Sequence, residues 1–384
     1  MKHSTERILT THCGSLPRPR DLLDLMKARA SGEPVDPAAY DARVRQAVAD
    51  IVRRQVDCGV DVVTDGEQSK TSFSAYVNER LTGFTPKADT RRTSFTAEIE
   101  AFPEYYEQYF GQAMQGGRVV PVAPVECTGP VSYRGQEALQ RDIDNLKAAV
   151  AAVQPTEVFM PAVAPSGVGT NAYYPSEEEY LFAVADALRT EYQAIVDAGF
   201  LVQIDDPFLT ELFSYSPLDA AARRQTAERY VEALNHALRG IAPDRVRYHT
   251  CYGINEGPRV FDASLKDTID VLLKINAGAI SFEAANPRHE HDYHAFEQVK
   301  LPEGKVIIPG VITHASNIVE HPQVIAERLV RFARLVGREN VIAGADCGFS
   351  SQATYRPEVH PTVVWAKFQA MAEGARLASQ QLWS

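Results

Sequence analysis

The feature that most constrains the fold is a series of eight short apolar runs that alternate with long amphipathic stretches. Each run has the length and composition of a β-strand, and the stretches between them carry apolar residues at the three-to-four spacing of helices. Alternating strands and helices are typical of a parallel sheet, and eight such units predict an α/β chain folded as a single (β/α)8 TIM barrel. The predicted strands lie within residues 8–15, 60–67, 157–167, 200–207, 245–253, 277–285, 305–314 and 340–348.

One segment, residues 85–135, breaks this alternation because it is rich in Tyr, Phe, Gly and Pro. We expect residues 1–384 to form one barrel, and residues 85–135 to be an insertion between its second and third strands, with a hairpin over the barrel mouth. The alternative is that this segment contains the third barrel strand and that residues 157–167 form an extra strand. The sequence leaves both arrangements open.

Composition limits the partners and the compartment. The formal net charge of −11 argues against nucleic acid or an anionic membrane surface as the main partner, because both require a basic face. The N-terminus lacks the apolar core of a signal peptide, and no apolar run approaches the length of a membrane span. The five cysteines are widely spaced and odd in number, which fits free thiols in a reducing compartment. We therefore expect a cytoplasmic protein that acts on small molecules.

Four residues with metal-binding side chains follow the predicted strands: His249, Cys251, Glu283 and Cys347. Side chains two apart on a strand point to the same side, so His249 and Cys251 can share one ion. One imidazole, two thiolates and a carboxylate suit four-coordinate zinc, and the carboxylate can give way to an incoming ligand. If that ligand is a thiol, the metal deprotonates it, and the sulfur can then accept an alkyl group.

Two simpler interpretations apply to the same residues. A buried cysteine often serves as a small apolar side chain, and a lone histidine is often hydrogen-bonded in a core. A zinc ion could also be purely structural, but structural sites are usually closed, Cys-rich sets in short loops. The four residues here are spread over three strand ends, where parallel barrels build their active sites, and this favours a catalytic metal.

The motifs around these residues resemble those of the cobalamin-independent methionine synthases, in their C-terminal catalytic barrel. The family has a His-x-Cys pair, a Glu on the next strand and a D-C-G motif. This chain matches them with HTC at 249–251, FEA at 282–284 and ADCG at 345–348. The resemblance implies a zinc-dependent methyl transfer to the thiol of homocysteine, giving methionine. It also implies that zinc is held by His249, Cys251, Glu283 and Cys347.

The same resemblance suggests where homocysteine and an acid catalyst lie. Gly14 and Ser15, in HCGS, would hold the substrate carboxylate, and Glu67 in TDGE and Asp205 in QIDDP would hold its ammonium group. Two carboxylates around one cation are complementary in charge. Without the resemblance, these carboxylates could equally be helix caps or ion-pair partners. His314, in GVITHAS, corresponds to a family histidine implicated in acid catalysis, and its alternative is a loop histidine.

The sequence also departs from the family. The tryptophans expected to stack on a pterin are replaced by Tyr173 and Tyr174, so the methyl donor is open. The related epoxyalkane:coenzyme M transferases add a zinc thiolate to an epoxide. Their substrate has a sulfonate and no amine, so that activity would require an arginine clamp. The candidates for such a clamp are Arg18, Arg20 and Arg288, and the three histidines His289, His291 and His294 are expected in a solvated loop.

Overall fold

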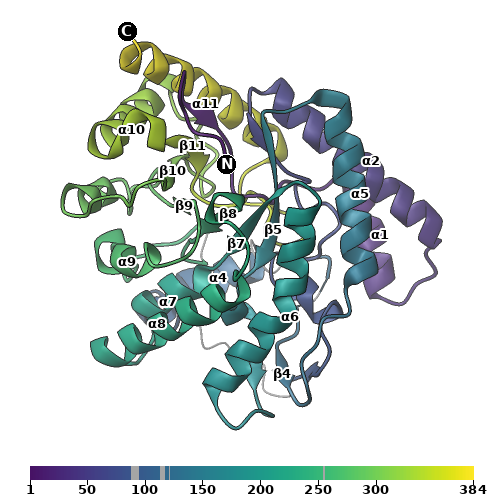
Figure 1. The fold of residues 1–384 in the computed structure, drawn as a ribbon. Helices are drawn as coiled ribbons and strands as arrows, with labels where there is room; N and C mark the ends of the chain where they lie inside the picture. The colour runs from purple at the N-terminus through teal and green to yellow at the C-terminus, as the bar shows by residue number, and fades with distance from the viewer. Residues whose placement is uncertain (88–94, 113–116, 121, 254–255) are drawn as a thin grey trace.

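Eight parallel strands form the core of the computed structural model, which describes all residues except 88–94, 113–116, 121 and 254–255. They pair in the order β1-β11-β10-β9-β8-β7-β5-β2. Hydrogen bonds from Asp61 N to Thr10 O (3.1 Å) and from Thr11 Oγ1 to Val62 O (3.0 Å) join the first and last strands of that order. The sheet therefore closes, and the predicted TIM barrel is confirmed (Figure 1).

The barrel strands are buried, apart from the first two residues of β5, because helices cover them outside and side chains fill the barrel inside. Every residue of β7 to β11 is buried, which explains why apolar residues dominate β10 and β11 and why the polar residues of β7 and β8 have buried side chains. The first two strands are only two residues long. The strands are β1 (Leu9–Thr10), β2 (Val62–Val63), β5 (Glu157–Val163), β7 (Leu201–Asp205), β8 (Val246–His249), β9 (Ala279–Phe282), β10 (Val306–Ile312) and β11 (Ile342–Ala345).

The outer helices begin and end where the sequence signals predict. For example, the Ser176 hydroxyl accepts a hydrogen bond from Glu179 N at the start of α6, and Gly199, at φ 95°, turns the chain into β7. None of the described helices is long and apolar enough to cross a membrane. The helices around the barrel are α1 (Arg20–Ala30), α2 (Pro37–Asp57), α5 (Gln136–Val153), α6 (Glu177–Asp197), α7 (Pro207–Tyr215), α8 (Ala220–Ala237), α9 (Leu265–Leu272), α10 (Pro322–Val336) and α11 (Pro361–Leu382).

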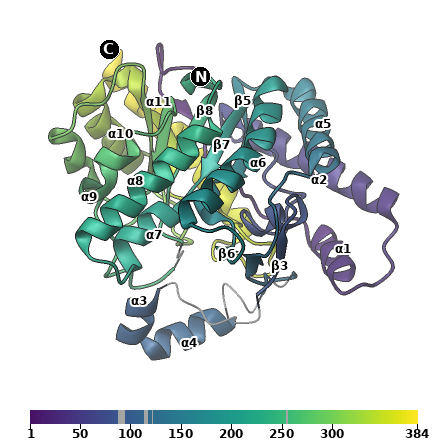
Figure 2. The same cartoon turned by 60° about the horizontal axis from the view of Figure 1, so that its bottom comes forward.

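Residues between β2 and β5 contribute two short helices and two strands of a separate small sheet, whose third strand, β6, follows β5. Strand β4 (Val125–Cys127) pairs antiparallel with β3 (Phe84–Pro86) and parallel with β6 (Thr170–Asn171), and none of the three joins the barrel sheet. The third barrel strand is therefore β5, and the alternative that places it within residues 85–135 is wrong. Helices α3 (Thr96–Ala101) and α4 (Pro103–Gln112) lie together at one end of the barrel (Figure 2).

Candidate metal centre and substrate cavity

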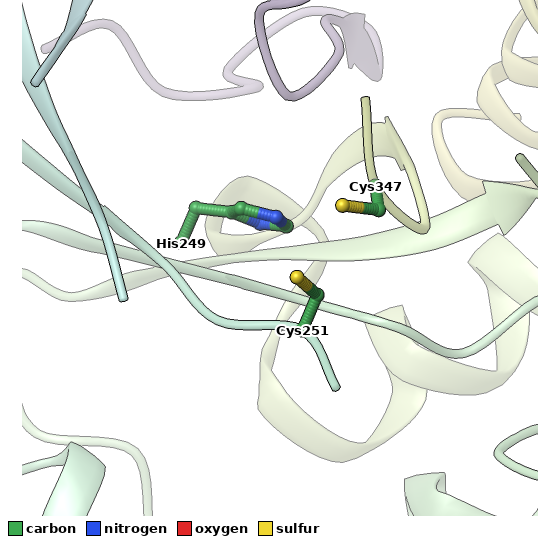
Figure 3. Close-up of side chains that lie close together, drawn as sticks. All are labelled: His249, Cys251 and Cys347. Carbon is green, nitrogen blue, oxygen red and sulfur yellow. The ribbon is translucent and has the colours of Figure 1, made fainter. Parts of the chain in front are cut away.

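Three of the four predicted metal ligands meet at the carboxyl ends of the barrel strands. His249 ends β8, Cys251 follows it by two residues, and Cys347 follows β11 by two residues. Their ligand atoms all lie within 4.8 Å of one another, and their side chains point toward a common centre (Figure 3). They are 3%, 8% and 9% exposed. The residues that are distant in sequence thus form one compact N, S, S donor set.

The orientation of His249 fits a metal ligand. Its Nδ1 lies 3.3 Å from the Ser281 hydroxyl, whereas its Nε2 is buried and has no hydrogen-bond partner among the described residues. Burial lowers the pKa of His249 to about 3, so the ring is neutral. If Nδ1 donates its proton to Ser281, Nε2 carries a lone pair toward the two sulfur atoms. A buried nitrogen without a partner beside two thiols is the arrangement that zinc would satisfy.

Glu283 lies beside this donor set but belongs to a second cluster of side chains. Its carboxylate groups with His314 and Asp346, with ligand atoms within 4.8 Å of one another. Glu283 Oε2 accepts hydrogen bonds from Arg259 Nη1 (2.7 Å) and Asn286 Nδ2 (2.8 Å), and Oε1 accepts one from Tyr252 N (3.3 Å). The structure therefore does not place Glu283 with the other three predicted ligands.

A small cavity opens onto the donor set, and the predicted substrate residues line it. Ser15, Glu67 and Asp205 line it together with His249, Cys251 and Cys347. Gly14 lies behind this wall at φ 125°, where an added Cβ would be 2.8 Å from Pro161 Cγ and 3.1 Å from Glu67 Oε1. Only glycine fits this close approach without strain.

Two acidic side chains line the cavity together with the sulfur atoms. Glu67 and Asp205 are 1% and 5% exposed, and Glu67 Oε2 has no hydrogen-bond partner among the described residues. Burial raises the pKa of both carboxyl groups, and the charge of Glu67 raises the pKa of Asp205 further. The nearby Lys70 ammonium donates to Pro161 O (2.6 Å) and sits 4.1 Å from the centre of the Tyr76 ring. The two carboxylates thus suit a cation supplied by a ligand.

The backbone of Glu67 is held in an unusual conformation that directs its side chain into the cavity. Its φ is 56°, in the left-handed region that non-glycine residues rarely adopt. Asp65 Oδ1 accepts a hydrogen bond from Glu67 N (2.9 Å), and Arg18 Nη2 donates to Glu67 O (2.7 Å) and Lys70 O (2.7 Å). Strain of this kind persists only where the surroundings fix it, and it is common at functional sites.

His314 is buried but does not line the cavity. It is 2% exposed, its Nδ1 has no hydrogen-bond partner among the described residues, and it lies with Glu283 and Asp346. Burial lowers the pKa of His314 to about 4, so its ring is neutral at pH 7. The structure therefore places His314 next to Glu283 and outside the described lining of the cavity.

The arginines proposed for an anion clamp are elsewhere. Arg18 is occupied by backbone carbonyls, Arg20 stacks 5.3 Å from the centre of the Tyr355 ring, and Arg288 Nη2 donates to Val260 O (3.2 Å). The described residues that line the cavity include neither Arg nor Lys. Tyr173 and Tyr174 are also absent from that lining, and Tyr173 is 51% exposed.

Several residues of the site were not predicted from the sequence. Ser281 precedes Glu283 by two residues, so the strand alternation places both on one face and could have revealed it. Cys13, Phe73 and Gln352 line the cavity without a comparable signal in the sequence.

His289 was expected in a solvated loop but is 2% exposed. Burial alone would lower the pKa of His289, but the carboxylates of Asp262 and Asp292 accept hydrogen bonds from its ring nitrogens and raise the pKa to about 9.

Comparison with known proteins shows the family to which the chain belongs. The family model described as "Cobalamin-independent synthase, Catalytic domain" matches residues 8–117 and 171–367. A methionine synthase of Sulfolobus acidocaldarius is 23% identical over 342 residues, which are 88% of this chain and 85% of the relative. A methionine synthase of Saccharolobus islandicus is 24% identical over 378 residues, which are 97% of this chain and 95% of the relative.

Solved structures show the same fold. The B12-independent methionine synthase from Shewanella sp. W3-18-1, in complex with selenomethionine, superposes with a TM-score of 0.74 at 19% identity. The superposition covers 98% of this chain and 99% of that chain. Because the family model spans most of the chain, this protein belongs to the family of cobalamin-independent synthase catalytic domains.

Proposed function

We propose that this chain transfers a methyl group to the thiol of homocysteine and that it uses zinc to do so. The observation that carries the proposal is one cavity that is lined both by a His-Cys-Cys donor set and by two buried carboxyl groups. An aminothiol matches both features, because its sulfur suits the metal and its ammonium suits the carboxylates. The relatives named methionine synthase support the same activity.

His249, Cys251 and Cys347 would hold the zinc, and Glu283 is the nearby carboxylate that could complete its coordination. Zinc, when bound, would supply the Lewis acidity that keeps the substrate sulfur ionised at neutral pH. Glu67 and Asp205 would orient the substrate through its ammonium, with Ser15 at the cavity wall near its carboxylate. The sulfur then attacks the methyl carbon in line: the new S–C bond forms as the bond to the donor breaks, and the donor takes the electron pair.

His314 would support the reaction from a position outside the cavity lining and would not contact the substrate. Its neutral ring lies with Glu283 and Asp346, where it can accept or donate a proton when the Glu283 carboxylate changes partners. A direct proton transfer from His314 to the methyl donor would require the donor to reach past the cavity lining. We therefore assign His314 to the support of Glu283.

The alternative of epoxide opening by coenzyme M is less compatible with the cavity. The described lining has two carboxylates and no Arg or Lys, so a sulfonate would be repelled. A purely structural zinc is also disfavoured, because two carboxylates with raised pKa face a cavity beside the donor set.

A product assay tests the proposed function. Zinc-loaded protein is incubated with homocysteine and trideuteromethyl donors, including N-methyl pterins and methyl sulfonium compounds, and the products are analysed by mass spectrometry. The expected product is methionine that carries the labelled methyl group, with none formed by metal-free protein. Turnover of coenzyme M with an epoxide, without labelled methionine from any donor, would contradict the proposal.

A further inference from the structure

The carboxylate of Glu283 is held by Arg259, a residue outside all of the motifs identified in the sequence. Arg259 Nη1 forms a salt bridge with Glu283 Oε2 at 2.7 Å, and the two side chains are 3% and 0% exposed. The guanidinium also pairs with Asp262 Oδ2 at 2.7 Å and lies 5.3 Å from the centre of the Tyr252 ring. The Arg259–Glu283 pair is thus buried directly beside the predicted metal ligands.

Arg259 is itself held in place by the segment inserted between β2 and β5. Its φ is 55°, in the left-handed region. Glu98, in α3, accepts hydrogen bonds from Arg259 N (3.2 Å, Oε2) and Phe261 N (3.0 Å, Oε1), and Tyr106 of α4 donates to Glu98 Oε2 (2.9 Å). Glu98 is fully buried. Helices α3 and α4, at the end of the barrel in Figure 2, therefore fix the loop that carries Arg259.

A second set of contacts holds Asp262, the other carboxylate partner of Arg259. His289 Nε2 lies 3.1 Å from Asp262 Oδ2, and His289 Nδ1 lies 2.7 Å from Asp292 Oδ2. The chain Glu283–Arg259–Asp262–His289–Asp292 alternates acidic and basic groups, and each side chain is nearly inaccessible to solvent. Such a network is rigid because every buried charge needs its neighbour.

We infer that Arg259 is a positioning residue that holds the Glu283 carboxylate back from the metal, so that the substrate sulfur can take the fourth coordination position. This inference rests on the proposed function. The physical reason is competition for one carboxylate between a guanidinium and a divalent cation. If the substrate thiol and Glu283 bind the metal at the same position, a weaker bond between metal and carboxylate would strengthen thiol binding.

The test uses Arg259→Met, which keeps much of the side-chain volume and removes the charge. Without the guanidinium, Glu283 should bind the metal more firmly. We expect zinc transfer to a chelator to become about tenfold slower, a change at the lower end of what neighbours of metal ligands cause. In cobalt-substituted protein, about tenfold more homocysteine should be needed to reach half of the sulfur-to-metal charge-transfer absorption. Faster zinc loss than in the wild type would overturn the inference.

Three further variants separate this role from a general loss of stability. The double variant Arg259→Met/Glu283→Gln should lose zinc at the rate of Glu283→Gln alone, because the effect acts through that carboxylate. Arg80→Met removes another buried arginine, paired with Asp142 (2.5 Å) and Glu191 (3.4 Å), and should lower Tm without slowing zinc loss. Glu98→Gln should reproduce part of the Arg259→Met effect, because it weakens the support of the loop.

The outcomes for the two proposals are distinct. If homocysteine changes the cobalt spectrum of the wild type but Arg259→Met changes neither zinc loss nor thiol binding, the positioning role is wrong and the proposed function stands. If no thiol changes the wild-type spectrum but zinc loss is still slowed by Arg259→Met and restored by the double variant, the proposed function is wrong. In that case the control of Glu283 by Arg259 stands.

Discussion

Glu67→Gln and Asp205→Asn are each expected to raise the KM for homocysteine at least about 30-fold, which corresponds to about 2 kcal/mol. Each substitution leaves the substrate ammonium buried with only one countercharge. Steady-state kinetics measures the effect, and zinc content should not change, because neither carboxylate is in the His-Cys-Cys donor set.

The same substitutions should stabilise the protein when no ligand is bound. Burial raises the pKa of both carboxyl groups, and the charge of Glu67 raises that of Asp205 further, so removing one of the two groups relieves an unfavourable buried charge. Tm should therefore stay the same or rise while the KM rises. Asp206→Asn is the matched control: Asp206 is also buried, but it accepts hydrogen bonds from Leu209 N (3.2 Å) and the Ser166 hydroxyl (3.0 Å) at the start of α7. This control should lower Tm and leave the KM unchanged. A KM unaffected by both Glu67→Gln and Asp205→Asn would show that the ammonium is bound elsewhere.

Cys251→Ser and Cys347→Ser should each lose most of the bound zinc and all measurable methyl transfer. A serine hydroxyl is a far poorer zinc ligand than a thiolate, so the affinity should fall by more than the ~10–100-fold typical of residues that only support a ligand. Elemental analysis of purified, dialysed protein measures this directly.

Cysteines outside the donor set serve as controls for this substitution. Cys58→Ser and Cys127→Ser should retain one zinc per chain, because neither residue lines the cavity. Cys13→Ser should also retain it: Cys13 lines the cavity, but its thiol donates to Ala345 O at 3.0 Å. Full zinc occupancy in both Cys251→Ser and Cys347→Ser would refute the assignment of these ligands.

The sequence was sufficient to predict the barrel because parallel strands buried on both faces have distinctive apolar runs. It also predicted that His249 and Cys251 share a site, because strand alternation fixes their common side; His249 ends β8 and Cys251 follows it by two residues. The fold also explains why Cys347 lies near His249 and Cys251, since the carboxyl ends of all eight strands meet at one end of a barrel.

The position of Glu283 could not be predicted in the same way. Strand β9 places Glu283 at the end of the barrel where the other predicted ligands lie. Its hydrogen-bond partner Arg259, however, lies in a loop after β8. The conformation of that loop depends on Glu98, which lies more than a hundred residues earlier in the chain, in the inserted segment. No periodic pattern links these three residues, so only the three-dimensional structure shows that they act together.

The most direct test of the central claim is a titration of cobalt-substituted protein with homocysteine and with 4-mercaptobutanoate, which is homocysteine without its amino group. Both thiols offer the same sulfur, chain length and carboxylate, so any difference reports on the ammonium. The structure predicts that homocysteine reaches half-saturation of the sulfur-to-metal absorption at a concentration at least about 30-fold lower, and that Asp205→Asn removes most of this preference. Equal affinity for the two thiols, or tighter binding of coenzyme M, would contradict the assignment of this cavity to an aminothiol.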